Sequence, residues 1–163
     1  MKLFSSIAAA ALTVALATAA AAAPGDVRVV IGPQLQLRAH DLGQRDLDRL
    51  ATELRGEVQR QIDRTPALAG AKADLILSAA TPNRPTFQQL SNTPGLSFES
   101  FGIGGATIDG TLTTPDGTVT PVHYRYYETD IRQAQHNGTW EDAEHAFDQF
   151  ARNLSRGQLV ASR

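Results

Sequence analysis

The sequence contains no cysteine, which excludes a disulfide framework, a thiol nucleophile, a thiolate zinc site and a lipid anchor on cysteine. It also has little excess of either charge, because 15 lysines and arginines stand against 17 aspartates and glutamates, a formal charge of −2. Phosphate backbones are bound by clustered positive charge, so this balance argues against a nucleic-acid partner. From residue 24 onward no apolar run is long enough to cross a membrane.

The N-terminal segment carries a single charged residue, Lys2, which is followed by an uncharged, alanine-rich run over residues 3–23. This pattern is typical of a secretory signal, and its alanines offer several A-x-A cleavage frames, with cleavage after Ala22 or earlier favoured over cleavage directly before Pro24. An uncleaved anchor is the alternative, but alanine is weakly hydrophobic beside leucine. The segment looks like a bacterial signal peptide, and that resemblance implies a periplasmic or secreted protein.

We therefore expect a signal peptide over residues 1–23 and a single α+β domain over residues 24–163. A strand is predicted at 27–31, continuing through Leu35 and Leu37 after a kink at Gly32-Pro33. Apolar residues then recur every three or four positions, which predicts a helix over about 44–63. A short apolar run at 73–80 predicts a second strand, parallel to the first because a helix connects them.

A long connection at about 81–101 carries three prolines but also five large apolar residues. Such loops are uncommon inside compact domains and are usually functional or disordered, and the apolar residues argue against disorder. We expect an ordered flap over residues 83–101, packed by its own side chains. By loop position alone, the expected exposed contact residues of the flap are Arg84, Phe87, Gln88 and Gln89.

A hairpin follows, turning at residues 114–118. Two pairings are possible, and the one that places Ile108 opposite Tyr124 keeps the apolar residues on one face. This pairing sets Asp109 opposite His123 on the other, polar face, which also carries Arg125 and Tyr127.

A last helix is predicted from the apolar stripe that runs from Trp140 to Leu154, opened by a capping box at Thr139 and Asp142. The tail over residues 158–163 is expected to fray.

The resulting fold class is α+β, with a two-layer, four-stranded mixed sheet, two helices on one face and the order β-α-β-β-β-α. This order of elements resembles the small α+β domains that recur in bacterial envelope proteins of unknown function, and the resemblance implies an accessory or adaptor role.

Two constellations could support chemistry. Asp109 and His123 form half of a general-base arrangement, but no nucleophile motif accompanies them. Glu141 and His145 lie one helical turn apart, near His136, and imidazole with carboxylate suits zinc or copper; no H-E-x-x-H is present. Each pair is better explained as an ordinary polar surface, so we expect no catalytic residue, no bound metal and no cofactor.

We therefore hypothesise an exported binding or accessory module that acts through the 83–101 loop and the polar hairpin face. Its partner is expected to be another envelope protein or a small ligand, with no nucleic acid and no stable membrane insertion after signal cleavage. The alternative is a small hydrolase or metal-dependent enzyme using Asp109 and His123, or Glu141 and His145. A third class, an oligomer that pairs exposed sheet edges, stays open, although Pro121 would blunt one edge.

Overall fold

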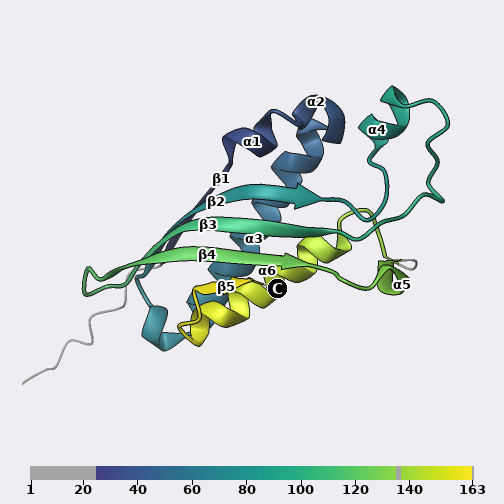
Figure 1. Ribbon diagram of the computed structural model, residues 1–163. Coiled ribbons are helices and arrows are strands. Elements are labelled where there is room, and N and C mark those ends of the chain that lie inside the picture. The colour runs from purple at the N-terminus through teal and green to yellow at the C-terminus, as the bar shows by residue number, and fades with distance from the viewer. Residues whose placement is uncertain (1–24, 135–136, 163) are drawn as a thin grey trace, which may run out of the picture.

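The computed structural model describes residues 25–134 and 137–162. They form an α+β fold in which one mixed sheet, in the strand order β1-β2-β3-β4-β5, carries helices on one side (Figure 1). The predicted fold class is confirmed, with five strands instead of four. The strands are β1 (Asp26–Ile31), β2 (Lys72–Thr81), β3 (Gly105–Thr113), β4 (Val119–Tyr127) and β5 (Val160–Ser162). The helices are α1 (Pro33–Gln36), α2 (Ala39–Leu42), α3 (Gln44–Arg64), η1 (Pro66–Leu68), α4 (Phe87–Asn92), α5 (Ile131–Ala134) and α6 (Glu141–Ser155).

The first half of the fold is a strand–helix–strand unit. β1 and β2 are parallel, as predicted, and α3 connects them. The apolar stripe of α3 is buried at every turn through Leu47, Leu50, Leu54, Val58 and Ile62. The predicted continuation of the first strand is wrong. Proline fixes φ and needs no N–H partner in a first helical turn, so Pro33 begins the short helix α1.

α3 and α6 pack against each other and cover the same side of the sheet, as predicted. α6 contributes Phe147 and Phe150, which are fully buried, and Phe150 lies 5.5 Å from the ring of Tyr124. Trp140, just before α6, and Tyr124 belong to this core, as expected. The opposite side of the sheet, which we call the open face, carries the polar residues of the strands.

The hairpin register is the predicted one, with Ile108 paired to Tyr124 and Asp109 paired to His123. Gly110, on β3, has a φ of +143°, and a Cβ built there would lie 2.1 Å from the carbonyl oxygen of Asp74 on β2. Only glycine fits between these two strands at this point.

Two local expectations about the second helix and the tail are wrong. The N-cap of α6 is Trp140 and not Thr139, and an indole has no acceptor for the N–H groups of a helix start. Asp142 does not complete a capping box either, because it is buried and its carboxylate accepts a hydrogen bond from Asn83. The tail does not fray completely, since β5 pairs in parallel with β4 between His123 and Arg125. Leu159, just before β5, is buried in the core.

The predicted signal segment lies outside the described residues. Within the part of the chain that the structure describes, no helix has both the length and the apolar character needed to cross a membrane.

Candidate functional site

The flap (residues 83–101) projects beyond the end of the sheet at which β2 finishes and β3 begins, opposite the turn between β3 and β4 (Figure 1). Its helical turn, α4, begins with a capping box. The hydroxyl of Thr86 accepts a hydrogen bond from the backbone N–H of Gln89 at 3.1 Å, and the side-chain oxygen of Gln89 accepts one from the N–H of Thr86 at 3.1 Å. This reciprocal pair satisfies backbone donors that a helix start otherwise leaves free.

A buried polar network fixes both ends of the flap to the start of α6. Asn83 is 1% exposed and Asp142 is 5% exposed. The side-chain amide of Asn83 donates to the carboxylate of Asp142, and its oxygen accepts from the Asp142 N–H at 3.0 Å. The same carboxylate accepts from the Gly104 N–H at 2.9 Å and from the amide of Asn137 at 2.8 Å. Buried polar groups paired in this way hold one conformation, because each broken bond would leave a buried group without a partner.

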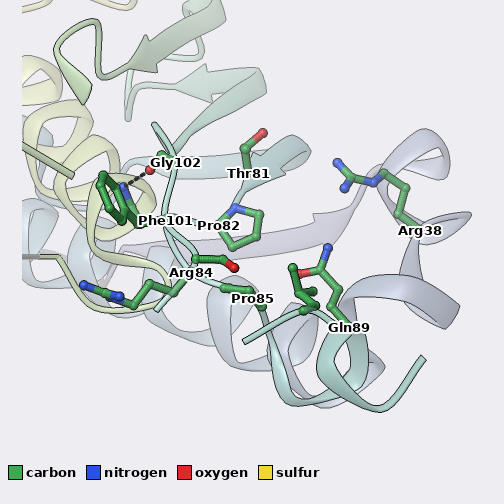
Figure 2. A pocket seen from close by; sticks show the side chains of 11 residues that line it. Arg38, Thr81, Pro82, Arg84, Pro85, Gln89, Phe101 and Gly102 are labelled. Carbon is green, nitrogen blue, oxygen red and sulfur yellow. Dashed lines mark hydrogen bonds between the residues drawn. The ribbon is translucent and has the colours of Figure 1, made fainter. Parts of the chain in front are cut away.

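A hollow of about 270 Å³ lies beneath the flap, with Arg38 and Gln89 on one side and Phe101 on the other (Figure 2). Its volume lies below the roughly 300–1,000 Å³ typical of sites that enclose a small-molecule ligand.

The four flap residues expected to be exposed divide into two pairs. Phe87 is 78% exposed and Gln88 is exposed as well, and both line a separate hollow beside the start of α3. Arg84 is partly buried instead, and its guanidinium donates to the backbone oxygens of Asn137 and Phe98, each at 2.8 Å. Gln89 is partly buried in the capping box and also donates to Asp41. Arg84 and Gln89 therefore shape the flap, whereas Phe87 and Gln88 are available to another molecule.

Sequence reasoning did not single out the apolar surface that the flap presents. Phe87 and Phe98 stack edge to face, with ring centroids 5.6 Å apart. Phe98 is 51% exposed, and Phe101 and Ile103 are 45% and 42% exposed. The run of apolar residues at 87–103 was visible in the sequence, but the pattern did not show which of them face outward.

Asp109 and His123 meet on the open face, as the register predicted. The Nδ1 atom of His123 lies 2.6 Å from one carboxylate oxygen of Asp109, and the hydroxyl of Ser78 donates to the other. Burial raises the pKa of Asp109, but the hydrogen bonds from Ser78 and His123 and the charge of His123 outweigh it, so the net pKa is lowered. Ser78 is the member of this cluster that sequence reasoning missed.

Arg125 and Tyr127 lie on the same face, nearer to the flap. The guanidinium of Arg125 sits 4.7 Å from the centre of the Tyr127 ring. Tyr127 also covers the backbone of Gly105, where a Cβ would lie 2.8 Å from the tyrosine ring. These contacts give both side chains a role within the sheet, since an aromatic ring commonly covers a strand glycine.

The order of the hydrogen bonds among Ser78, Asp109 and His123 limits the chemistry that these residues can perform. The serine hydroxyl is bonded to the aspartate, whereas a serine nucleophile is activated by a hydrogen bond to the imidazole.

The second pair of candidate residues, Glu141 and His145, makes contacts with other residues in place of a contact with each other. Glu141 accepts from the Gly138 N–H at 2.7 Å, and the imidazole of His145 packs 5.2 Å from the ring of Tyr126. His136 lies outside the described residues, and within the described ranges no three histidines, aspartates or glutamates are grouped to hold a metal.

The flap and the open face are therefore two separate candidate surfaces, and the hollow beneath the flap includes none of Asp109, His123, Arg125 and Tyr127. Comparison of the chain with protein-family models, curated proteins and solved structures finds no match. The function is thus inferred from the geometry of this chain alone.

Proposed function

We propose that this protein is an exported binding or accessory module that holds a partner protein, such as another envelope protein, through the apolar surface of its flap. The observation that carries this function is the exposed ring pair Phe87 and Phe98, which lies on a loop whose two ends are fixed by buried hydrogen bonds. Clustered exposed aromatic side chains are typical of protein interaction sites.

The fixed conformation of the flap favours binding for an entropic reason. A flexible loop loses conformational freedom when it binds, and that loss weakens the complex. Here Arg84 already connects Asn137 to Phe98, and the Asn83–Asp142 network already fixes the ends. The apolar side chains are therefore presented before the partner arrives.

Charge contributes little to this surface. Residues 83–101 contain one cation, Arg84, and one anion, Glu99. Recognition would then depend on apolar contact and shape, so we expect the affinity for the partner to vary weakly with salt concentration, unlike an interface steered by charge.

The test places a photo-crosslinking amino acid at Gln88, beside the exposed Phe87, in intact cells. A matched position is Asp116, which is exposed in the turn at the opposite end of the sheet. We expect one discrete crosslinked species from Gln88 and none of the same mass from Asp116. The same species from both positions, or none from Gln88, would contradict binding by the flap.

A second pair of variants tests the aromatic residues themselves. Replacing Phe87 and Phe98 together by serine should abolish the crosslink from Gln88. The control, Val119→Ser, removes another apolar side chain, 61% exposed, from the far end of the hairpin and should leave the crosslink intact. Equal loss in both variants would mean that general surface hydrophobicity, and not the flap, holds the partner.

A second candidate function is a small hydrolase with His123 as general base. It is favoured by one observation, the 2.6 Å contact that lets Asp109 orient the imidazole. His123→Ala distinguishes the two functions. A hydrolase would lose its activity in a broad screen of ester, glycoside and phosphate substrates, whereas a binding module would keep its crosslinked partner.

A further inference from the structure

A second hollow lies on the open face of the sheet, over the strands β1, β2 and β3. Its volume is about 360 Å³, within the roughly 300–1,000 Å³ typical of small-molecule sites. Its lining includes Leu75, which is 2% exposed, and Gly110, which has no side chain to fill the space. This hollow shares no lining residue with the hollow beneath the flap, so it is a separate site.

Two opposite charges line this hollow without pairing with each other. Arg28 of β1 and Asp74 of β2 are partners in the strand register, so their side chains begin side by side on the open face. Both residues are exposed, and the ion pairs formed among the described residues include neither of them. The hollow therefore offers a guanidinium and a carboxylate at neighbouring positions to the charged groups of a ligand.

The neighbouring part of the hollow is apolar. Val30 and Ile76 are the next pair of register partners on the same face, and they are 41% and 37% exposed. They lie two residues beyond Arg28 and Asp74 along each strand, a separation of about 6.6 Å at the usual rise per residue. Burial of exposed apolar surface against an apolar group of a ligand is favourable. The hollow thus combines a charged pair at one end with an apolar wall at the other.

We propose that this hollow binds a free α-amino acid with a large apolar side chain, such as leucine or phenylalanine. The ligand carboxylate pairs with Arg28, whose planar guanidinium has donors placed for two carboxylate oxygens. The ligand ammonium pairs with Asp74, and the ligand side chain packs on Val30 and Ile76. An α-amino acid carries both charges at one carbon, which suits two side chains that begin on strands about 4.8 Å apart.

Other classes of ligand use only part of this hollow. A residue inside a peptide has neither a free carboxylate nor a free ammonium at its α-carbon, so it would leave Arg28 and Asp74 without partners. A simple carboxylic acid would leave Asp74 unpaired. Glycine and alanine are too short to reach from the charged pair to Val30 and Ile76. Amino-acid binding goes beyond the proposed function and does not depend on it, because the hollow and the flap are different surfaces.

The test is a titration of the isotope-labelled protein with L-leucine, followed by NMR. We expect saturable shifts of the amides that line the hollow, Leu75 and Gly110 among them, and unchanged amides in the flap. Leucinamide lacks the carboxylate and isocaproate lacks the ammonium, so each should bind about tenfold more weakly, the usual effect of one charged hydrogen-bond partner. Glycine and N-acetyl-leucine amide should cause no saturable shift.

Two substitutions and a matched control assign the charges. Arg28→Gln should weaken leucine binding about tenfold and make leucine and leucinamide bind equally. Asp74→Asn should make leucine and isocaproate bind equally. Lys72→Gln removes a positive charge from the same face of β2, outside the hollow, and should leave the dissociation constant for leucine unchanged. Circular dichroism checks that each variant is folded.

Three results would overturn the amino-acid site. One is the absence of saturable shifts at every leucine concentration that is soluble. Another is equal binding of leucine, leucinamide and N-acetyl-leucine amide, which would mean that the hollow accepts any apolar group. The last is equal weakening by Arg28→Gln and Lys72→Gln, which would mean that the net charge of the face, and not contact with Arg28, attracts the ligand.

Discussion

The Asp109 carboxyl shows how two neighbours hold a partly exposed acid in its charged form. Desolvation favours the protonated acid, whereas the Ser78 hydroxyl and the His123 ring favour the anion, and the net pKa is lowered. An acid whose pKa is lower in the folded state stabilises the fold above its unfolded pKa. That contribution is lost as the pH falls through the folded pKa.

Replacing Ser78 by alanine should raise the pKa of Asp109, because the anion loses one hydrogen-bond donor while the desolvation remains. The measurement is the pH dependence of the Asp109 carboxyl carbon shift by NMR. Thr107→Ala, on the same face of β3 but paired with Arg125, should leave the midpoint unchanged. A midpoint in Ser78→Ala that is unchanged or lower would show that Ser78 does not stabilise the anion.

Removal of the Asp142 carboxylate should destabilise the fold more than loss of an exposed acid, because this carboxylate is almost fully buried. Asp142→Ala should lower the free energy of unfolding by about 3 kcal/mol, since the donors on Asn83, Asn137 and Gly104 would lose their acceptor inside the protein. Urea titration followed by circular dichroism measures the change. Asp148→Ala, which removes an exposed ion pair with Arg152, should cost about 1 kcal/mol or less. Equal losses would mean that the buried network contributes no more than a surface pair.

At the scale of the elements, the close approach of β2 and β3 depends on Gly110, because a glycine has no side chain to hold the two strands apart. Gly110→Ala would place a Cβ against the Asp74 carbonyl oxygen and would require a backbone conformation that alanine rarely adopts. We expect a loss of stability of about 3 kcal/mol or failure to fold, on the scale of severe backbone substitutions. Thermal unfolding of the purified variants measures it.

The control for this substitution is Gly102→Ala in the chain leading to β3. A Cβ there would meet nothing within 4 Å, and its φ lies outside the positive range. Stability should change by no more than about 0.5–1 kcal/mol, in either direction. If both alanine variants unfold at the wild-type temperature, the two strands can separate at Gly110 without cost.

At the scale of the whole molecule, the short strand β5 completes one edge of the sheet. Ending the chain after Gly157 would remove the buried Leu159 and the hydrogen bond from the His123 N–H to the Leu159 carbonyl at 3.0 Å. We expect a loss of about 2–4 kcal/mol in the free energy of unfolding, together with a stronger tendency to aggregate. Urea titration and light scattering measure the two effects. A truncated chain as stable as the full one would mean that the tail adds nothing to the sheet.

The hairpin and the buried network differ in how far the sequence predicts them. Asp109 and His123 were paired correctly because a turn of known length and an alternation of apolar residues fix the register. Ser78 sits on β2, which reaches β3 through the long connection that contains the flap, so no local rule aligns the two strands. Asn83 and Asp142 are 59 positions apart, and Asp142 in a first helical turn resembles an ordinary cap.

The alternation of apolar residues was enough by itself to determine the two long helices α3 and α6, four of the five strands, the hairpin register and the α+β class. Burial of apolar surface is non-directional, so a periodic stripe identifies the buried side of an element without reference to its neighbours. Only the tertiary structure decided that the tail becomes β5, that Arg84 braces the flap while Phe87 stays exposed, and that β1 forms one edge of the sheet among the described residues. Hydrogen bonds require a partner at a defined distance and angle, and the chain brings those partners together only when it is folded.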